Sequence, residues 1–498
     1  MKRNIGQFKK SPYDLLVVGG GINGSAVANL AAQNGLRTAL LEKNDFASGA
    51  SSKSTKLIHG GLRYLENFEF GLVKESLRER TAQLRSAPHL VKPLAFIIPV
   101  YKNDRRPLWM MKLGVSIYDL LSGKHIIHPY KPLSVEEVLH FIPSVEKKNL
   151  TGGLIYWDAQ MDDARLVLEN VLQADKSGAH VANYVEVKSI IKENGKAVGV
   201  KARDLLTNET FDVRCRKIVC AAGPWTNLFQ QKEMNKAPDK IRTTKGIHIV
   251  YNARFSPHAV FIQSKKDDRI FFVIPWHGHT LIGTTDSDYT DNPDDVSVKP
   301  EDIDYLFKEA SRVFPEEKFT DEKIITTFAG LRPLVNAADG SPGKISRRHV
   351  IEDSFSGIQY IYGGKYTTYR VIAQQSVQKI LKKKILFSDD ISLYGGGKLN
   401  KSPMELCEQY GIEPSMIESL IQTYGSRAED VLILTTKDPI LKERIHLSST
   451  MIKAQIRYSV DVEMAIKEDD ILIRRLPISY TGAINHAVRR YINSLLVQ

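Results

Sequence analysis

Hydrophobic and polar positions near the N-terminus follow two different periods. Residues Asp14–Val18 form a mostly apolar run with β-branched side chains, which is typical of a buried parallel strand. Residues Asn23–Gln33 place small apolar side chains on one helical face, and Gly35 follows as a typical C-terminal stop. Residues Arg37–Glu42 predict a second strand. The pattern therefore predicts a β–α–β unit within a doubly wound parallel sheet.

The pattern changes several times farther along the chain. Residues Gly71–Leu84 are helical and charged in pattern, whereas residues 94–130 look irregular, with prolines and aromatic side chains. Strand-like alternation occurs in residues 182–200, 213–222, 244–250 and 269–285, the last with a hairpin at "WHGH". Because these strands lie between pieces of the first domain, we expect an interleaved antiparallel sheet that carries the substrate site.

The character of the chain changes again after about residue 387. The stretch "LYGGGKLNKSP" is typical of a linker, and Ser402–Glu405 forms a capping box with Pro403 at the first helical position. The remaining residues are mostly helical in pattern. We therefore expect two regions, residues 1–388 and a helical cap of residues 389–498.

Composition and charge exclude several classes of protein. With 498 residues and 42% hydrophobic side chains, the chain is long enough for two or three domains and is neither disordered nor fibrous. A formal net charge of +12 suits an anionic substrate, an anionic membrane surface or nucleic acid, or only a solvated surface. No basic stretch with interleaved aromatic side chains supports nucleic-acid binding. The basic N-terminus has no apolar segment typical of a secretory signal, and no apolar run reaches the roughly 18 residues of a transmembrane helix.

Cysteine and histidine spacing gives no reason to expect a metal. The three cysteines show no C-x-x-C spacing, so neither a zinc site nor a disulfide framework is expected, and the chain fits a reducing compartment. His277 and His279 have H-x-H spacing at a hairpin tip, without a carboxylate or cysteine pair near them in the sequence. The "GGGK" stretch near Gly397 lacks the Lys-Ser/Thr pair of a phosphate-binding loop.

Three glycines after the first strand match the dinucleotide fingerprint. Gly19 permits a tight turn, Gly21 lets the backbone approach a pyrophosphate, and Gly24 lets the helix pack against the strand. The N–H groups and partial positive charge of the helix N-terminus then face the phosphates. Glu42, at the end of the second strand, can accept hydrogen bonds from ribose hydroxyls and would repel a 2′-phosphate, which argues against NADP.

The stretch "ASGASSKSTKLIHGGLRYLE" favours FAD over NAD. With it, the chain resembles the FAD-dependent glycerol-3-phosphate dehydrogenase family, which belongs to the flavoproteins built like the amino-acid oxidases. The resemblance covers nearly the whole chain, and its other motifs are "WDAQMDDARLVL", "IVCAAGPWT", "IPW" followed by "IGTTD", "AGLRPL" and "YGGKYTTYR". Two departures are Cys220, where the family more often has Asn, and Leu476-Pro477 in place of a threonine after the arginine pair.

The resemblance implies a fold and its division along the chain. The fold is an α/β FAD-binding doubly wound sheet of the glutathione-reductase/amino-acid-oxidase type, with an interleaved antiparallel substrate domain and an α-helical C-terminal domain. FAD-binding parts are expected at residues 11–90, 150–235 and 325–388, and substrate-binding parts at residues 91–149 and 236–324.

The resemblance also implies which residues hold the flavin. Clustered hydroxyl side chains and glycines can lie along a flavin, donating to its phosphates and ring, and a cation near the pyrimidine end stabilises the reduced ring. The expected cofactor-binding residues are Gly19, Gly20, Gly21, Ile22, Asn23, Gly24, Glu42, Lys43, Ser51, Ser52, Thr55, Lys56, Leu57, His59, Gly60, Gly61, Val187, Ala221, Ala222, Gly223, Trp225, Gly330, Gly364, Lys365, Tyr366, Thr367 and Thr368.

A phosphorylated substrate needs fixed cations and a base. By resemblance, Arg63 and Arg332 hold the phosphate, because guanidinium groups match phosphate oxygens in pairs. Lys365 belongs to the same predicted site, and Tyr64 and His248 are expected to contact the substrate. His59 is the preferred base for the hydroxyl proton and His248 is the alternative.

The implied activity is oxidation of sn-glycerol 3-phosphate to dihydroxyacetone phosphate. FAD takes the hydride, and electrons pass to a membrane quinone. The alternative is an oxidase that passes electrons to oxygen and makes hydrogen peroxide. The family's longer oxidases carry an extra segment that this chain lacks. An amino-acid oxidase and a flavin-binding scaffold without turnover are further alternatives, but the phosphate-type cations argue against both.

The expected location is cytoplasmic, peripherally attached to the inner face of the cell membrane. The basic excess and the apolar-aromatic stretch "PLWMMKLGVSIYDLL", residues Pro107–Leu121, suit docking on an anionic bilayer, although the same stretch also suits a protein core. The amphipathic C-terminal stretch "AINHAVRRYINSLL" suits a membrane or partner surface as well. A homodimer is compatible with the resemblance.

Overall fold

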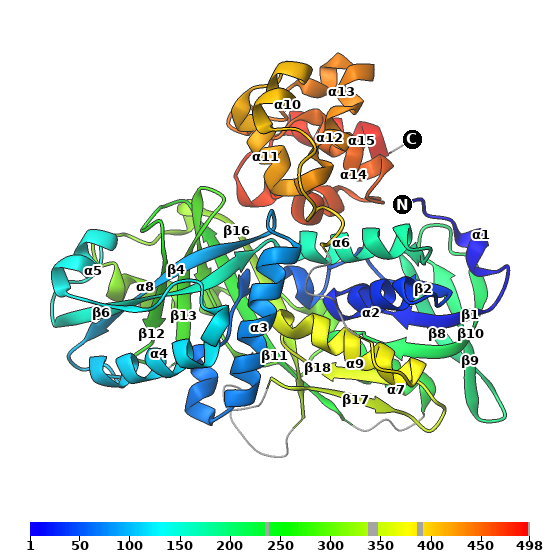
Figure 1. Ribbon diagram of the computed structural model, residues 1–498, viewed down its shortest axis with the longest axis horizontal. Helices are drawn as coiled ribbons and strands as arrows, with labels where there is room; N and C mark the ends of the chain where they lie inside the picture. Colours follow the sequence, from blue (N-terminus) through cyan, green and yellow to red (C-terminus); the bar gives the residue numbers. More distant parts are fainter. Residues whose placement is uncertain (235–238, 268, 337–346, 386–391, 497–498) are drawn as a thin grey trace.

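Two β-sheets lie side by side and a helical domain sits above them in the computed structural model, which describes residues 1–234, 239–267, 269–336, 347–385 and 392–496 (Figure 1). The first sheet has the strand order β17 (His349–Asp353), β18 (Gln359–Gly363), β10 (Thr210–Cys220), β1 (Tyr13–Val18), β2 (Thr38–Leu41) and β7 (His180–Ala182). Strands β18 to β7 are parallel and β17 is antiparallel. The doubly wound parallel sheet predicted from the sequence is thereby confirmed.

The first sheet is apolar on both faces because each face is covered. Leu15 and Val17 of β1 point to helices α2 (Ile22–Gln33), α6 (Asp163–Lys176) and α9 (Tyr369–Leu381). Leu16 and Val18 point the other way and pack against residues of β10 and of the hairpin β8 (Val185–Glu193) and β9 (Lys196–Asp204). The register pairs Val18 with Cys220 on one side and with Leu41 on the other, so three strands end at the same edge.

The second sheet is the predicted interleaved sheet, because its strands alternate along the chain with segments of the first sheet. Its order is β15 (Ser287–Asp288), β11 (Ile241–Tyr251), β14 (His279–Gly283), β13 (Ile270–Trp276), β12 (Ala259–Gln263), β4 (Val91–Tyr101), β6 (Leu150–Met161) and β3 (Leu57–Ile58), with β16 (Ile324–Val335) beside β11 and β5 (Lys131–Leu133) beside β6. Most neighbours are antiparallel, but β12 and β4 are parallel. The hairpin predicted around "WHGH" is present as β13 and β14.

The sheet membership bears on the expected division of the chain. Strands β6 and β16 pair within the second sheet, although they fall in segments assigned from the sequence to the FAD-binding parts. The expected junctions at residues 235–236 and 388–389 lie outside the described residues. The domain boundaries therefore stay a prediction.

Residues 94–130 are mostly regular, which corrects the expectation of an irregular stretch, although residues 102–107 and 126–130 lie outside helices and strands. The stretch contains most of β4 and then α4 (Leu108–Ser122), and α4 packs against α3 (Phe70–Ser86) and η2 (Leu62–Asn67). Before the C-terminal domain, the chain also forms the helices α1 (Ile5–Phe8), α5 (Val135–Phe141), α7 (Thr226–Glu233) and α8 (Pro300–Val313).

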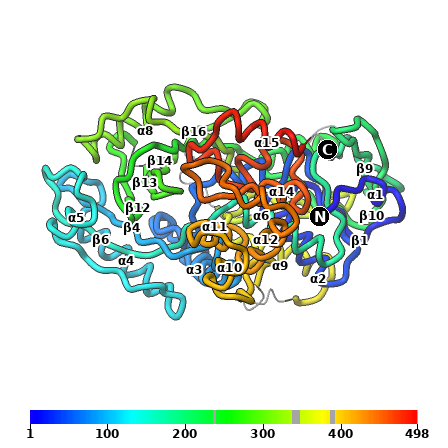
Figure 2. Tube along the Cα trace, turned by 90° about the horizontal axis from the view of Figure 1, so that it is seen from above, coloured from blue at the N-terminus to red at the C-terminus, as the bar shows by residue number. Residues whose placement is uncertain are grey.

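The C-terminal domain is helical, as predicted. It contains α10 (Pro403–Tyr410), α11 (Pro414–Tyr424), α12 (Ala428–Leu432), α13 (Leu434–Lys437), α14 (Lys453–Asp461) and α15 (His486–Leu496). The predicted capping box is confirmed, because Ser402 Oγ accepts from Glu405 N–H and Glu405 Oε2 accepts from Ser402 N–H. Seen from above, these helices lie over α6 (Figure 2). None of the helices in the described part of the chain has the length and hydropathy needed to cross a bilayer.

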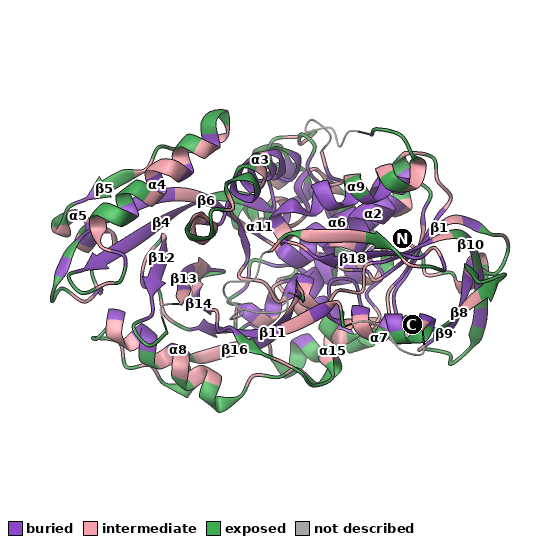
Figure 3. Ribbon diagram, turned by 90° about the horizontal axis from the view of Figure 1, so that it is seen from below, coloured by how far each residue is buried: buried purple, intermediate pink, exposed green. Residues whose placement is uncertain are grey.

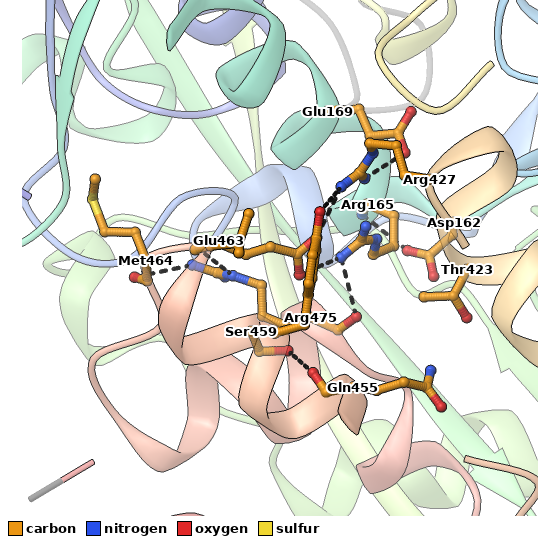
Figure 4. Close-up of polar contacts among 12 residues, drawn as sticks. Asp162, Arg165, Glu169, Thr423, Arg427, Gln455, Ser459, Glu463, Met464 and Arg475 are labelled. Carbon is orange, nitrogen blue, oxygen red and sulfur yellow. Dashed lines mark hydrogen bonds and ion pairs between the residues drawn. The ribbon is translucent and has the colours of Figure 1, made fainter. Parts of the chain in front are cut away.

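Buried ion pairs join this domain to α6. Arg165 of α6 lies 2.8 Å from a carboxylate oxygen of Glu463, and Arg427 of the C-terminal domain lies 3.1 Å from Glu169 of α6 (Figure 4). All four side chains are nearly inaccessible to solvent. Removing one partner of such a pair leaves an uncompensated buried charge, which is strongly destabilising.

Candidate active site

A cavity of about 810 Å³ is lined by residues of both sheets. Gly19, Glu42, Ala221 and Gly364 line it directly after the carboxyl ends of β1, β2, β10 and β18. Ligands of open α/β sheets bind at this edge. The cavity continues along η2 and into the second sheet, so one space connects the fingerprint glycines to the predicted substrate residues.

Most of the residues expected to hold a cofactor line this one cavity. They are Gly19, Gly21, Ile22, Asn23, Glu42, Lys43, Ser51, Thr55, Leu57, His59, Gly61, Val187, Ala221, Ala222, Gly223, Trp225, Gly330, Gly364, Lys365, Tyr366 and Thr367. The predicted substrate and catalytic residues Arg63, Tyr64, His248 and Arg332 also line it. Gly20, Gly24, Ser52, Lys56, Gly60 and Thr368 are not among its lining residues.

Glycines are required where the first turn meets the end of β10. A Cβ atom on Gly19, whose φ is +108°, would lie 2.6 Å from the carbonyl oxygen of Ala221. A Cβ atom on Gly24 would lie 1.9 Å from the carbonyl oxygen of Gly19. Any side chain at either position would therefore push the N-terminus of α2 away from the cavity.

Glu42 and the rim beside it are fixed by hydrogen bonds. One Glu42 oxygen accepts from Gly20 N–H at 2.6 Å and the other from Asn44 N–H at 2.8 Å. Burial raises the pKa of Glu42. At the rim, Asp294 accepts from both Lys43 Nζ, at 2.6 Å, and Trp225 Nε1, at 2.9 Å. The remaining lone pairs of Glu42 are left for a ligand hydroxyl.

Lys56 makes a different contact from the one expected. Its Nζ donates to Asp163 at 2.6 Å and to the Ser52 carbonyl at 2.8 Å, and its side chain is buried. Burial disfavours its charge, but Asp163 outweighs that effect and the pKa of Lys56 is raised. The geometry gives Lys56 a role in holding the hydroxyl-rich segment in place, outside the cavity.

His59 and Lys365 lie together in the cavity. Lys365 Nζ donates to the backbone carbonyl of His59 and lies 5.1 Å from the Tyr64 ring centroid. Burial lowers the pKa of Lys365 to about 7. Burial, followed by the nearby cations Lys365 and Arg80, holds the pKa of His59 well below its usual range. His59 is therefore the neutral imidazole at physiological pH.

The second histidine candidate is also in the cavity. His248 on β11 is 1% exposed, stacks on Phe328 at a centroid distance of 5.0 Å, and has Nε2 3.0 Å from Thr55 Oγ1. Its Nδ1 has no hydrogen-bond partner among the described residues. Burial holds the pKa of His248 well below its usual range, with Arg332 and Lys56 adding to the effect. Both predicted bases are therefore neutral, and both line the cavity. The structure does not choose between them.

Arg332 is fixed in the cavity by its neighbours. It donates to Thr284 Oγ1 at 2.7 Å and to Asp286 Oδ1 at 3.1 Å. A Cβ atom on Gly246 would lie 2.3 Å from Arg332 Nη2, so a glycine is needed to make room for the guanidinium. Burial lowers the pKa of Arg332 to about 10, which leaves it charged at neutral pH.

Several lining residues were missed by sequence reasoning. Arg347 lies 3.8 Å from Asp286, and Arg269 also lines the cavity. Thr284 and Asp286 fall inside the quoted "IGTTD" motif, so that motif could have suggested them. Neither arginine belongs to a motif, so the sequence offered no signal for them.

Comparisons with known proteins identify the family. Residues 14–370 match the family model described as FAD dependent oxidoreductase, and residues 387–495 match the C-terminal domain of alpha-glycerophosphate oxidase. The chain is 38% identical to a glycerol-3-phosphate dehydrogenase of Synechocystis sp., over 96% of this chain and 91% of that protein. It is 34% identical to an aerobic glycerol-3-phosphate dehydrogenase of Staphylococcus aureus, over 95% of this chain and 88% of that one.

The chain belongs to the FAD-dependent glycerol-3-phosphate dehydrogenase/oxidase family. Among solved structures, the glycerol-3-phosphate dehydrogenase from Bacillus halodurans complexed with FAD matches with a TM-score of 0.79 and 30% identity, covering 99% of this chain and 95% of that one. The L-alpha-glycerophosphate oxidase from Mycoplasma pneumoniae, at 19% identity and a TM-score of 0.58, shares the fold. The predicted family, fold class and FAD cofactor are confirmed.

The residues of this family member fit FAD. The cavity volume of about 810 Å³ lies in the upper part of the range of small-ligand sites, roughly 300–1,000 Å³. The 12-residue helix α2 begins at the cavity with the glycine turn that a side chain would close. Glu42, whose two oxygens each keep a lone pair beyond the backbone hydrogen bonds, and the buried Lys365 both line this cavity. Glu42 would accept from a ribose hydroxyl, the N-terminus of α2 would face the pyrophosphate, and Lys365 would supply positive charge to the reducible ring.

Proposed function

We propose that the chain oxidises sn-glycerol 3-phosphate to dihydroxyacetone phosphate and delivers the electrons to a membrane quinone. The observation that carries the substrate assignment is the group of guanidiniums at one end of the cavity. Arg332 and Arg347 both lie beside Asp286, and Arg63 lines the same space. Several cations around a single carboxylate leave a net positive site, which suits a phosphate dianion.

The proposed roles follow from the positions of these side chains. Arg63 and Arg332 bind the phosphate, and Tyr64 closes the wall beside Lys365. A neutral histidine, His59 in our assignment and His248 as the alternative, accepts the proton of the C2 hydroxyl as that carbon becomes a carbonyl. Bound FAD would supply the acceptor for the hydride that leaves C2. Lys365, in its protonated form, supplies the positive charge that stabilises the electron-rich ring.

The first test is anaerobic bleaching of the yellow holoenzyme. We expect glycerol 3-phosphate to bleach the flavin absorbance fully and to yield one equivalent of dihydroxyacetone phosphate. Glycerol and simple amino acids are expected to bleach it at least about 100-fold more slowly at equal concentration, because they lack the phosphate. Equal bleaching by an amino acid would overturn the substrate assignment.

The acceptor is tested by reoxidation of the bleached enzyme. A soluble quinone analogue is expected to reoxidise it at least about tenfold faster than air-saturated buffer. The competing function is an oxidase, which is favoured by the match of residues 387–495 to an oxidase domain. Fast reaction with oxygen and one equivalent of hydrogen peroxide would decide for the oxidase and against the quinone.

The proposal extends to cellular location and to the division of the chain. A quinone acceptor requires the enzyme to meet a bilayer, so we place it in the cytoplasm on the inner face of the cell membrane. The oxidoreductase region is residues 1–388 and the cap is residues 389–498. Fractionation of cells is expected to leave the activity with the membranes at low ionic strength and to release part of it at high ionic strength.

A further inference from the structure

A buried polar network lies against the backbone of Gly60, outside the cavity. The Gly60 N–H donates to Tyr118 Oη at 2.7 Å. The same hydroxyl donates to Asp158 and lies 2.8 Å from each carboxylate oxygen. Arg80 Nη1 donates to Asp158 Oδ1 at 2.7 Å. The side chains of Tyr118, Asp158 and Arg80 come from α4, β6 and α3, are each 1% exposed, and do not line the cavity.

The hydrogen bonds of this network have a fixed direction. A carboxylate paired with arginine can only accept, so the Tyr118 proton is directed to Asp158 and the Tyr118 oxygen is left to accept from Gly60. Asp158 Oδ1 lies 3.3 Å from the Gly60 nitrogen and is a second, longer acceptor. A Cβ atom on Gly60 would lie 2.3 Å from Tyr118 Oη. The network therefore contacts this backbone so closely that only glycine fits.

The Gly60 backbone connects the network to groups that line the cavity. His59 precedes it, and the His59 carbonyl accepts a hydrogen bond from Lys365 Nζ. The His59 N–H donates to Thr367 Oγ1 at 3.2 Å. Gly61 follows, and a Cβ atom there would lie 3.2 Å from Lys365 Nζ. His59, Gly61, Lys365 and Thr367 all line the cavity, so a shift of the Gly60 backbone would move the carbonyl that holds Lys365.

Helix α3 supports both of the motifs that meet here. Arg80 donates to the carbonyls of Trp157 and His125 at 2.9 and 2.8 Å, in addition to its bond with the network. One turn later, Gln83 Nε2 donates to the Thr367 carbonyl at 2.6 Å. Figure 3 shows α3 between α4 and α9, with buried residues along it. One helix therefore holds the "HGG" and "YGGKYTT" segments in place without lining the cavity itself.

The charges around Lys365 belong to the same network and the same helix. Burial lowers the pKa of Lys365 to about 7, Asp158 and Glu75 act to raise it, and Arg80 acts to lower it. The ring of Tyr64 lies 5.1 Å from Lys365 Nζ. If Asp158 lost its charge, Arg80 would remain, so the positive charge of Lys365 would be less favourable.

We propose that Tyr118 and Asp158 are positioning residues for flavin reduction, because they hold the Gly60 N–H and, through the His59 carbonyl, keep Lys365 where the reducible ring binds. They act through Lys365, whose positive charge stabilises the electron-rich ring. The inference rests on the proposed role of Lys365, but it is tested without substrate. The readout is the midpoint potential of the bound flavin, measured on the holoenzyme by equilibration with redox dyes.

Tyr118→Phe tests the hydrogen bond alone, because it removes the acceptor of the Gly60 N–H without changing any charge. We expect the ratio of affinities for reduced and oxidised FAD to fall about threefold or more at pH 7, which lowers the two-electron midpoint potential by roughly 14 mV or more. Tyr410→Phe is the matched control, since the buried Tyr410 also donates to a carboxylate, that of Glu429, at 3.0 Å. Tyr410 lies in the C-terminal domain, and the control should stay within about 1.5-fold of the wild type.

Asp158→Asn tests the charge. The wild-type potential is expected to fall more steeply with pH above the pKa of Lys365, which is about 7, because reduction then draws a proton onto Lys365. In Asp158→Asn this change of slope should move down by about half a pH unit or more. Glu463→Gln is the matched control, because it removes a buried carboxylate that pairs with Arg165 at 2.8 Å and does not line the cavity. That control should leave the change of slope within about 0.2 pH units.

The Lys365→Met background tests the route of the effect. Lys365→Met is expected to lower the potential and to remove the change of slope. Tyr118→Phe added to Lys365→Met should change the affinity ratio by less than about 1.5-fold, because two substitutions that act through one group are not additive. Full additivity would mean that Tyr118 acts on the flavin by another route and would overturn the proposal.

The remaining contrary outcomes are distinct. A Tyr118→Phe potential equal to that of the wild type would overturn the proposal, and this variant decides alone if Asp158→Asn does not fold. An unshifted change of slope in folded Asp158→Asn would overturn it too, as would an equal effect in either control. A wild type that glycerol 3-phosphate does not reduce would contradict the proposed function and leave the potentials intact as the test of the network.

Discussion

The guanidinium of Arg475 forms two hydrogen bonds with the carboxylate of Asp45, at 2.7 and 2.8 Å, and both side chains are buried. Arg474 donates to the same carboxylate at 2.6 Å. Asp45 follows the second strand of the cofactor-binding unit by only a few residues, close to Glu42. The C-terminal domain therefore contacts the segment that shapes the nucleotide end of the cavity.

The Arg475→Leu variant is expected to lose about 3–5 kcal/mol in the free energy of unfolding, because Asp45 would keep a buried charge with one partner fewer. Urea unfolding of the holoenzyme measures the loss. Arg489→Leu is the control, because Arg489 and Glu468 form a partly exposed ion pair that contributes at most about 1 kcal/mol. Equal losses in the two variants would contradict the structural role of Asp45.

Acid is expected to weaken the same contact. Although burial alone would raise it, Arg475 and Arg474 lower the pKa of Asp45 from 3.8 to about 2, and His89 and Arg427 lower that of Glu169 from 4.5 to about 2. A carboxyl with a depressed folded-state pKa stabilises the fold above its unfolded pKa and loses that contribution as the pH falls. The unfolding free energy is therefore expected to drop as the pH falls from 4.5 to 2, by about 2 kcal/mol for Asp45 and about 3 kcal/mol for Glu169.

Thermal unfolding measured across that pH range checks this expectation. The Arg475→Leu variant should show a shallower acid dependence, because Asp45 loses its strongest stabilising partner. A wild type whose unfolding temperature is flat from pH 5 to 2 would show that these carboxylates do not titrate in the folded state as described.

Local sequence patterns predicted the first unit of the fold well. The strand predicted at Asp14–Val18 is observed at Tyr13–Val18, and the helix predicted at Asn23–Gln33 is observed at Ile22–Gln33. Strand alternation, helix period and turn glycines are all properties of neighbouring residues, so they can be read without the fold.

Other features depend on information that is not local. Helix α4 was missed because apolar side chains on both of its faces hide the 3.6-residue period. The pairing of Asp45 with Arg475 joins residues 430 positions apart. Arg347 lines the cavity because the fold brings it next to Asp286, which lies far from it in the sequence. No sequence motif contains Arg347, so its position could not be predicted. The choice between His59 and His248 stayed open because both line the same space.

Glu42 is expected to determine how tightly FAD binds. In Glu42→Ala the Gly20 and Asn44 N–H groups lose their acceptor, and the ribose loses its partner. We expect the dissociation constant for FAD to rise at least about tenfold. Titration of the apoprotein, followed by flavin fluorescence, measures it. Glu193→Gln, an exposed substitution at the end of β8, serves as the control and should bind FAD as the wild type does.

Arg332 is expected to act on the phosphate and not on the alcohol. In Arg332→Leu the KM for glycerol 3-phosphate should rise about 10- to 100-fold, the range for a lost hydrogen bond to a charged group. The slow reaction with glycerol should change by less than about threefold, because glycerol has no phosphate to lose. Arg254→Leu, at an exposed arginine bonded to the Gly278 carbonyl, is the matched control. An equal loss with both substrates would point to a disturbed cavity instead of a lost phosphate contact.

The pH profile of flavin reduction is expected to report on Lys365. Burial lowers the pKa of Lys365 to about 7, so the cation is present below that pH and is lost as the pH rises. We expect the reduction rate to decline above pH 7, by about tenfold at pH 9. In Lys365→Arg the charge persists, and the decline should move at least about one pH unit upward. Stopped-flow reduction from pH 5.5 to 9 measures both curves, and identical curves would remove Lys365 from this role.

The alternation of the chain between the two sheets has a consequence for biosynthesis. The fingerprint turn at Gly19 is translated early, but β18 and Lys365, which line the same cavity, come much later. At roughly 5–20 residues per second, the ribosome needs on the order of 20–70 s to travel from one to the other. Throughout that interval the nascent polypeptide has half a nucleotide site and unpaired strand edges. Flavin supply therefore matters after release from the ribosome, and shortened translation products should emerge colourless and be targets for chaperones and proteases.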